Sequence, residues 1–403
     1  MDTQPPLRCT FQVGYDVPVH FLRDAFAPDQ DLLAEVMTAP AGRPRRALVY
    51  VDERVVTAHP GLEHAIHTWF QVRERQGVRL AARPQVISGG EAAKADLGIV
   101  ERIGRTCADL GIDRHSHLII IGGGAVLDAV GFAASLIHRG IRQIRLPTTT
   151  LAQADAGLGV KNAINAFGNK NFLGTFTPPW AIINDARFLE ALDDRSWRCG
   201  IAEAVKVAII KDLAFFARLE AMTPLLAQRD AAAMTEVVRR SAELHLGHIA
   251  GSGDPFEQGS SRPLDFGHWS AHRLEIATGH RLLHGEAVAI GVALDACYAV
   301  EIGRLQEAEA ARIHQVLAGV GFRLWDEELD LRDRHGQRAI LAGLEQFREH
   351  LGGELTLAMP DGLGRQRDLT EFDPRCFERA LARLRRWRIT PSSASPAVPS
   401  TLG

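Results

Sequence analysis

The residues between Arg139 and Asn171 combine features that suit the binding of a phosphorylated, hydroxyl-rich molecule. A strand-like run leads into a threonine triplet, an isolated carboxylate at Asp155 and then Lys161, and the segment closes with asparagines around Lys170. Its glycines would let the backbone approach a ligand closely. Lysine, asparagine and threonine together supply the hydrogen bonds that phosphate and hydroxyl groups require. Taken alone, the same composition also fits a solvated, turn-rich loop.

One acid and several histidines further along could hold a metal ion. His268 and His272 stand four residues apart in HWSAH, so a helix would place both imidazoles on one face. His284 begins the motif HGE at an expected helix start, and Glu203 lies in an apolar helical run, where an acid needs a partner. A metal would be such a partner. An ion pair with Lys206, one turn later, is the alternative, and the sixteen histidines could also fall near one another by chance.

A glycine triplet follows the apolar run LIII and precedes a helical pattern. In this arrangement the backbone N–H groups at Gly123 and Gly124 and the helix N-terminus would face a pyrophosphate. Asp52, at the end of another predicted strand, could bind a ribose hydroxyl. Glu91 and Lys94 could belong to the same site, or form an exposed i, i+3 pair on a helix. Because the triplet does not match GxGxxG, it fits a tight turn between strand and helix equally well.

Composition and charge argue against several classes of protein. The 403-residue chain is 46% hydrophobic and 24% charged, and its net charge of −3 gives no basis for binding nucleic acid or an anionic membrane surface. Five cysteines form no CxxC pair, which predicts reduced thiols. We see no signal-peptide pattern and no apolar run long enough to span a bilayer. These features predict a soluble cytoplasmic protein with no nucleic-acid or membrane partner.

Two kinds of pattern divide the chain and would position these residues. Strand-like runs at 47–52, 118–121, 142–147 and 180–185 alternate with helical stretches, which predicts an α/β sheet with crossover connections. Beyond residue 186, apolar residues recur near a 3.6-residue period. We therefore expect an irregular N-terminal extension, an α/β domain, a mainly helical domain and a disordered Pro/Ser-rich tail, at residues 1–45, 46–186, 187–388 and 389–403.

Several motifs in one order and spacing give the sequence a specific resemblance to a known family. They are GGGAVLDAVGF, RLPTTTLAQADAGLGVKNAIN, NKNFLGTF, GIAEAVKVAIIKD, DFGHWSAH and LLHGEAVAIG. Together they resemble the sugar phosphate cyclases, of which 3-dehydroquinate synthase is the best-known member, over about residues 47–360. The resemblance implies a Rossmann-like NAD-binding α/β domain followed by a mainly α-helical metal-binding domain. It also implies NAD and a divalent metal, zinc or cobalt, as cofactors and a small sugar phosphate as substrate.

The resemblance gives individual residues of this chain a role. The implied metal ligands are Glu203, His268 and His284, so His272 becomes a phosphate or proton-handling neighbour in place of the ligand that the HxxxH spacing indicated. Positions that match the family's NAD contacts are Asp52, Glu91, Lys94, Gly123, Gly124, Asp128, Thr148, Thr149 and Lys170. Positions that match its substrate-handling residues are Asp155, Lys161, Asn171, Lys206 and Glu257. Arg139 matches an arginine that reaches the neighbouring subunit's active site, which implies a homodimer.

The family's chemistry explains why a dinucleotide, a metal and phosphate-binding lysines occur together. NAD accepts a hydride from the sugar and later returns it, so it is a recycled catalyst, while the metal acts as a Lewis acid on adjacent hydroxyls. Phosphate leaves between these steps, and an aldol reaction closes a carbocycle, which makes the enzyme a carbon–oxygen lyase. Lysines and asparagine would orient the phosphate as its own base, with Glu257 and His272 as proton carriers.

Departures from the dehydroquinate synthase pattern bear on the substrate. His245 stands where those enzymes usually have a lysine, Asp265 replaces an asparagine and Ser261 replaces an arginine. Fewer cationic and amide donors disfavour a substrate carboxylate. RPLDFGH and FREHLGG resemble motifs of cyclases that act on sedoheptulose 7-phosphate, although His272 matches the dehydroquinate synthases. We expect sedoheptulose 7-phosphate as substrate. The alternatives are the carboxylated 3-deoxy-arabino-heptulosonate 7-phosphate, a metal-dependent polyol dehydrogenase activity, and a cyclase-like binding protein without turnover.

Overall fold

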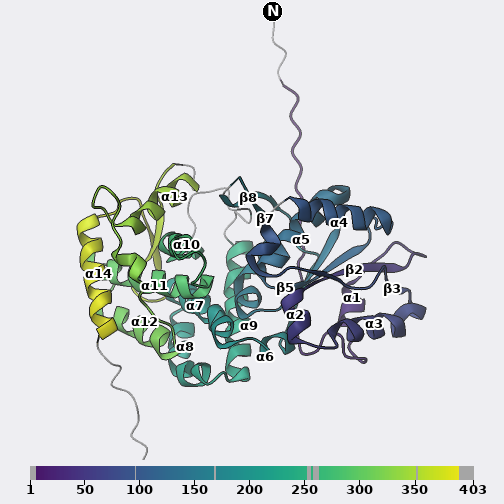
Figure 1. Cartoon of the computed structure of the whole chain (residues 1–403), viewed down its shortest axis with the longest axis horizontal. Helices are drawn as coiled ribbons and strands as arrows, with labels where there is room; N and C mark the ends of the chain where they lie inside the picture. The colour runs from purple at the N-terminus through teal and green to yellow at the C-terminus, as the bar shows by residue number, and fades with distance from the viewer. Residues whose placement is uncertain are drawn as a thin grey trace, which may run out of the picture.

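An α/β domain and a mainly helical domain lie side by side along the long axis of the molecule (Figure 1). The computed structural model describes residues 6–95, 97–167, 169–251, 256, 263–350 and 353–389. In this part of the chain the strands of the main sheet come before residue 186, and long helices dominate after it. The fold class predicted from the alternating and helical patterns is therefore confirmed. No helix among the described residues is long and apolar enough to cross a bilayer.

A seven-stranded sheet, counted over the described residues, forms the centre of the α/β domain. Its order is β1-β9-β6-β5-β2-β3, and β4 pairs with the end of β2; all of these pairings are parallel. The strands are β1 (Val19–Leu22), β2 (Arg45–Asp52), β3 (Val78–Leu80), β4 (Gln85–Ile87), β5 (His117–Gly122), β6 (Arg142–Pro147) and β9 (Ala181–Asp185). Parallel neighbours need crossover connections, which place helices on both faces.

Alternate residues of the central strands face different helical layers. On β5, Ile119 and Ile121 pack into one apolar cluster, while Leu118 and Ile120 pack into another on the opposite face. The helices beside the first cluster are α1 (Leu32–Val36), α2 (Glu53–Ala58) and α3 (Leu62–Arg73), and those beside the second are α4 (Gly98–Asp109) and α5 (Gly124–Leu136). Short turns complete this domain: η1 (Glu74–Gln76), η2 (Gly90–Lys94), η3 (Ile137–Arg139) and η4 (Ala152–Ala156).

The N-terminal segment differs from the predicted structure, and the segment around Lys161 and Lys170 is a hairpin and not a loop. Residues 1–45 were predicted to be an irregular extension. This prediction is wrong for β1 and α1, because β1 pairs with β9 and adds an edge strand to the sheet. This strand is too short for a sequence pattern, and its pairing with β9 stabilises it. The stretch rich in asparagine and lysine forms an antiparallel hairpin of β7 (Lys161–Ala166) and β8 (Asn169–Phe176), in place of a turn-rich loop. The predicted tail lies, from residue 390 onward, outside the described residues.

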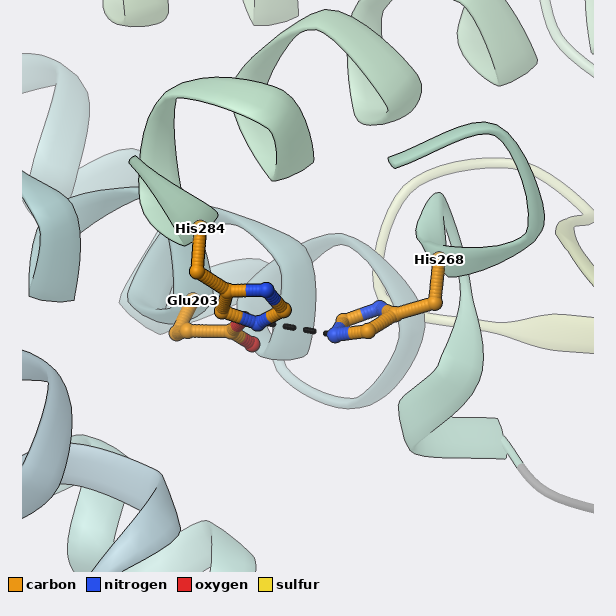
Figure 2. A group of neighbouring side chains, drawn as sticks. All are labelled: Glu203, His268 and His284. Atoms are coloured by element: carbon orange, nitrogen blue, oxygen red, sulfur yellow. Dashed lines mark ion pairs between the residues drawn. The ribbon is translucent and has the colours of Figure 1, made fainter. Parts of the chain in front are cut away.

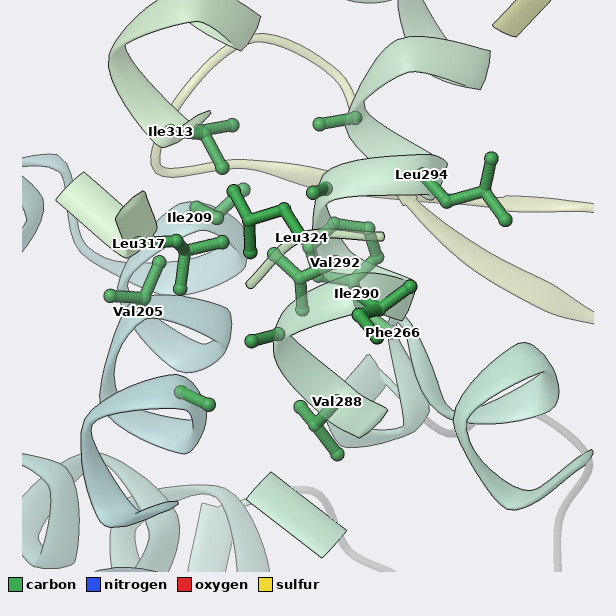
Figure 3. Packing of buried hydrophobic residues seen from close by; sticks show 14 of the residues in the cluster. Val205, Ile209, Phe266, Val288, Ile290, Val292, Leu294, Ile313, Leu317 and Leu324 are labelled. Atoms are coloured by element: carbon green, nitrogen blue, oxygen red, sulfur yellow. The ribbon is translucent and has the colours of Figure 1, made fainter. Parts of the chain in front are cut away.

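The helical domain is built around α7 (Asp194–Lys211) and α11 (His284–Glu301), whose residues are buried on nearly all sides. Figure 3 shows Val205 and Ile209 of α7 in one cluster with Val288 of α11 and Leu317 of α12. Burial of each such side chain contributes about 1.5–3 kcal/mol. The other elements are α6 (Arg187–Glu190), α8 (Leu213–Ala227), α9 (Ala231–Gly251), η5 (Pro263–Asp265), α10 (His268–Ala277), α12 (Glu307–Gly319), η6 (Glu327–Asp330), η7 (Ala339–Leu341), α13 (Ala342–His350), β10 (Leu357–Pro360), β11 (Gln366–Leu369) and α14 (Pro374–Ile389).

Candidate active site

Two glycines of α11 bring the expected metal ligands together. A Cβ on Gly285 would lie 2.5 Å from the Cα of Cys199, so α11 begins in direct contact with α7 one turn before Glu203. A Cβ on Gly291 would lie 2.0 Å from the carbonyl oxygen of Gly267, the residue before α10. Gly267 itself has a φ of +78°, a left-handed conformation that glycine adopts without strain. The close packing of α7, α10 and α11 thus follows from small residues at their contacts.

Glu203, His268 and His284 point toward one another from these three helices (Figure 2). The Nε2 atoms of His268 and His284 each lie 3.4 Å from Oε1 of Glu203. One ligand atom from each residue lies within 4.8 Å of the other two. Glu203 and His268 are buried, and His284 is partly exposed. One carboxylate and two imidazole nitrogens converging in this way form a donor set that suits zinc and similar divalent metals.

The surroundings of Glu203 keep its carboxylate charged but leave it short of partners. Both of its oxygens are buried and lack a hydrogen-bond partner among the described residues. The ammonium of Lys206 lies 2.5 Å from Oε2, without hydrogen-bonding geometry. Burial alone would raise the pKa of Glu203, but Lys206 and the His268 and His284 rings together lower it well below its usual value. A buried, ionised and unsatisfied carboxylate is what a cation would complete.

The outer nitrogens of both imidazoles have acceptors that orient the rings. Nδ1 of His268 lies 3.1 Å from the carbonyl oxygen of Phe266, and Nδ1 of His284 lies 3.0 Å from Oε1 of Glu275. With the protons of both rings held at Nδ1, Nε2 is the nitrogen of each ring that could bind a metal. Burial lowers the pKa of His284, but the nearby carboxylates of Glu203 and Glu275 outweigh it and raise the pKa to about 9. A metal would therefore have to displace a proton from this ring.

His272 lies next to this group and belongs to a second, overlapping cluster. Its ring centroid is 5.4 Å from that of His268 and 6.0 Å from that of His284. Ligand atoms of His272, Glu275 and His284 also lie within 4.8 Å of one another. His272 is exposed, whereas Glu203 and His268 are buried. The structure thus places His272 beside the first cluster, and its role as a phosphate or proton-handling neighbour remains a prediction.

A small cavity adjoins the carboxylate of Glu203. The described residues that line it include Asp155 of η4, Lys206 of α7, and Ser241 and His245 of α9. Nδ1 of His245 lies 3.2 Å from Oδ1 of Asp155, and Nζ of Lys206 lies 3.7 Å from Oδ2 of the same carboxylate. Burial, the strongest influence, lowers the pKa of His245, so the imidazole is neutral near pH 7. The Ser241 hydroxyl is buried without a partner among the described residues.

Residues expected to contact the dinucleotide lie at the carboxyl edge of the sheet. Asp52 ends β2 and is buried, and its Oδ1 accepts the Arg54 N–H at 2.8 Å. Burial raises the pKa of Asp52. Gly123 precedes α5 without a side-chain cap, so the first amides of this helix, including Gly124, point outward as donors. Thr148 and Thr149 follow the neighbouring strand β6, and a Cβ on Gly123 would touch Thr149 at 3.4 Å. The arrangement fits a pyrophosphate.

Polar side chains connect α5 and η2 to the hairpin. The buried ammonium of Lys94 donates to the carboxylate of Asp128 on α5 and, at 2.9 Å, to Oδ1 of Asn171 on β8. Lys170, the preceding residue of β8, lies 3.7 Å from Oε1 of Glu91. The hairpin is therefore attached to η2 and, through Lys94, to α5, and Lys161 is exposed on its other strand.

One predicted site residue, Arg139, does not lie in this group. Arg139 is exposed at the end of α5 opposite Gly124, about 20 Å away along a helix of this length, so it cannot reach the site of its own chain. His138 and Arg139 both have a positive φ, 53° and 64°. The expectation that Arg139 serves a neighbouring subunit remains a prediction. Glu257 lies outside the described residues, as does Ser261.

Glu275 and Ser241 lie at the site but were not among the residues predicted from the sequence. Glu275 stands seven residues after His268 and three after His272, so the three share one face of α10, a signal that could have been read. Ser241 precedes His245 by four residues on α9 and shares its face, but a single serine in a helix carries no distinguishing pattern.

Comparison with known proteins assigns the chain to a family. The profile of the 3-dehydroquinate synthase N-terminal domain matches residues 85–199, and the profile of the C-terminal domain matches residues 200–337. The chain therefore belongs to the 3-dehydroquinate synthase family. The resemblance read from the sequence motifs, and the dehydroquinate synthase-like fold that it implied, are confirmed.

Within this family the chain is similar to enzymes with two different names. It is 38% identical to the 2-epi-5-epi-valiolone synthase of Streptomyces glaucescens over 280 residues, 69% of this chain and 70% of the relative. It is 35% identical to the 3-dehydroquinate synthase of Paracoccus denitrificans over 366 residues, 88% of this chain and 95% of the relative. A solved structure of ValA, the 2-epi-5-epi-valiolone synthase of Streptomyces hygroscopicus subsp. jinggangensis with NAD+ and Zn2+ bound, superimposes with a TM-score of 0.82. That match has 28% identity and covers 94% of this chain and 100% of the other.

Proposed function

We propose that this protein is an NAD- and divalent-metal-dependent cyclase that converts a seven-carbon ketose phosphate to a carbocycle with elimination of phosphate, and that the ketose is sedoheptulose 7-phosphate. The observation that carries the proposal is the convergence of Glu203, His268 and His284 beside the Asp155–Lys206 cavity. The solved valiolone synthase that holds NAD+ and Zn2+ supports both cofactors here. We also propose a homodimer, because Arg139 lies too far from the site of its own chain to act there.

The three candidate metal ligands indicate where a substrate would bind. When bound, the metal supplies Lewis acidity and NAD accepts and returns a hydride. Glu203, His268 and His284 would hold the metal, and the rings are already oriented by acceptors at Nδ1. Lys206 donates to the carbonyl oxygen of Leu264 at 2.5 Å and faces the cavity between two carboxylates. It would therefore stabilise negative charge that develops on a substrate hydroxyl.

The hairpin supplies the groups that would bind the phosphate. Lys161 and Asn171 stand on its two strands, and Asn171 is held by the buried ammonium of Lys94. Cationic and amide donors on one rigid hairpin would orient a phosphate next to the carbon from which it leaves. His272, exposed beside the metal cluster, would exchange a proton with the phosphate or with the substrate.

The groups around Asp155 favour a neutral substituent over a carboxylate. His245 is buried, uncharged near pH 7 and 3.2 Å from the Asp155 carboxylate. A substrate carboxylate about 4 Å from Asp155 would meet a repulsion of about 4 kcal/mol at an effective dielectric of 20. A lysine at this position would offset that repulsion, and neutral His245 does not. The hydroxymethyl group of sedoheptulose 7-phosphate, in contrast, could hydrogen-bond to Asp155, His245 and Ser241.

The test is phosphate release and product mass with both seven-carbon sugars side by side. The purified protein, with NAD and zinc, should release phosphate from sedoheptulose 7-phosphate and form a product lighter by the elements of phosphoric acid, without net accumulation of NADH. Release from the carboxylated sugar alone would identify a 3-dehydroquinate synthase and overturn the substrate assignment. Steady NADH formation from simple polyols, without phosphate release, would show a dehydrogenase.

A further inference from the structure

Glu275 of α10 contacts the two halves of the site with its two oxygens. Its side chain is buried, 4% exposed, so both contacts are made away from bulk water. Oε1 lies 3.0 Å from Nδ1 of His284, and Oε2 accepts a hydrogen bond of 3.2 Å from Nζ of Lys170. His284 belongs to the metal cluster, whereas Lys170 belongs to the β8 strand of the α/β domain. One carboxylate thus joins the two domains at the site.

On the metal side, Glu275 determines how His284 presents its ring. A carboxylate can only accept, so Nδ1 of His284 must carry a proton, and Nε2 is the nitrogen left to bind a metal. Nε2 faces Glu203, whose Oε1 is 3.4 Å away. Without the carboxylate the ring could rotate or adopt the tautomer with its proton on Nε2, and the metal would lose one prepared ligand.

On the nucleotide side, Glu275 determines where Lys170 lies. The ammonium of Lys170 sits between two carboxylates, 3.2 Å from Glu275 and 3.7 Å from Glu91. Glu91 also accepts a hydrogen bond of 3.3 Å from Nδ2 of Asn165 on β7. A change at Glu91 or at the hairpin would therefore alter the electrostatic potential at Glu275. Through Glu275 it would alter the orientation of the His284 ring.

We propose that Glu275 couples the metal site to the dinucleotide site, so that each ligand binds more tightly when the other is present. The inference rests on the proposed function, because only the family resemblance assigns Glu91 and Lys170 to the dinucleotide site. A dinucleotide bound beside Glu91 and Lys170 would fix the position of the Lys170 ammonium, Lys170 would hold Glu275, and Glu275 would hold His284 in the orientation that binds metal. By linkage, metal would strengthen NAD binding by the same factor.

The experiment measures metal affinity with and without NAD. Chelator-treated protein is titrated with zinc against a chromophoric competitor, in the absence of NAD and at saturating NAD. The wild type should bind zinc at least about fivefold more tightly with NAD, within the usual range of coupling between sites. Glu275→Gln should weaken zinc binding about 10- to 100-fold, as loss of a carboxylate behind a metal-binding histidine does, and should abolish the NAD effect.

The variant Lys170→Met distinguishes coupling between the metal and dinucleotide sites from orientation of the His284 ring. It keeps the contact between Glu275 and His284, so zinc affinity without NAD should fall by less than in Glu275→Gln, while the NAD effect disappears. Glu220→Gln, at an ion pair with Arg312 between α8 and α12, is the matched control and should behave as the wild type in both titrations. Because Lys170→Met leaves the buried acid intact, it stays informative where Glu275→Gln does not fold.

Three results would overturn the coupling. They are a wild-type zinc affinity that NAD does not change, an NAD effect retained in Lys170→Met, and wild-type zinc binding by Glu275→Gln. Each can occur in a protein that releases phosphate, so the proposed function would survive it. If metal were held instead by the overlapping cluster of His272, Glu275 and His284, then Glu275→Gln would abolish binding and His268→Asn would leave it intact, which also refutes a positioning role for Glu275.

Discussion

The buried ion pair of Glu203 and Lys206 should respond to zinc in opposite ways when one or the other member is removed. The two side chains are 2% and 3% exposed, and their charged atoms lie 2.5 Å apart. Removing one member of such a pair leaves the other charge uncompensated in a low dielectric. We therefore expect both Glu203→Gln and Lys206→Met to destabilise the metal-free protein.

The magnitude follows from the partners that remain. Breaking a buried pair typically costs about 3–5 kcal/mol of unfolding free energy. After Glu203→Gln, Lys206 keeps the Leu264 carbonyl at 2.5 Å and Asp155 at 3.7 Å, so the loss should be near the lower end. After Lys206→Met, only the His268 and His284 rings, each 3.4 Å from Oε1, remain beside the Glu203 carboxylate, so the loss should be near the upper end. A divalent cation would replace the missing positive charge beside Glu203.

Zinc should therefore rescue Lys206→Met and fail to rescue Glu203→Gln. The assay is urea unfolding of chelator-treated protein with and without zinc, for both variants and for Lys211→Met, a control on the same helix that should stay within about 1 kcal/mol of the wild type. Zinc should stabilise Lys206→Met by more than it stabilises the wild type. Equal stabilisation of wild type and Glu203→Gln by zinc would refute the reasoning, because it would place the metal elsewhere.

Three further predictions concern the substrate, pH and assembly. His245→Lys puts an ammonium beside Asp155 and should raise kcat/KM for the carboxylated sugar relative to sedoheptulose 7-phosphate by about 10- to 100-fold, measured by phosphate release; an unchanged ratio would contradict the substrate argument. Burial raises the pKa of Asp295 to about 7, above its value in the unfolded chain, so the folded state binds the proton more tightly and stability should fall as pH rises from about 4 to 7. Relative to Asp295→Asn, the wild type should lose up to about 4 kcal/mol of unfolding free energy across that window, and parallel pH profiles would disprove this. Mixing inactive Arg139→Ala and Glu203→Gln subunits should restore about a quarter of wild-type activity, since only mixed dimers hold one complete site; no recovery after subunit exchange would exclude a shared site.

The buried central strands of the sheet could be located from sequence patterns. Apolar runs such as those of β2 and β5 are continuous because parallel strands are covered on both faces, so they stand out from their surroundings. β1 was missed because a strand of four residues acquires its stability from pairing with β9, which no local pattern records. The β7–β8 hairpin was missed for a related reason: β8 is largely exposed, and its asparagines and lysine do not follow the apolar pattern of a buried strand.

Residues of the candidate site could be predicted from the sequence where their type is one that folding alone does not require. Glu203 inside an apolar helix signalled a partner from sequence alone, and the structure places two imidazoles and Lys206 beside it. The choice between His268 and His272 could not be made from the HxxxH spacing, because both face the same way on α10. Glu275 was not found, since an acid on a helix is ordinarily a solvated one, and only the packing of α10 against α11 and β8 shows otherwise.

The measurement that tests the central claim most directly is the position of the metal. Crystals grown with zinc and NAD, with diffraction data collected at the zinc absorption edge, should show one anomalous peak about 2.0–2.2 Å from a carboxylate oxygen of Glu203 and from Nε2 of both His268 and His284. A peak among His272, Glu275 and His284, or no peak near Glu203, would contradict the account.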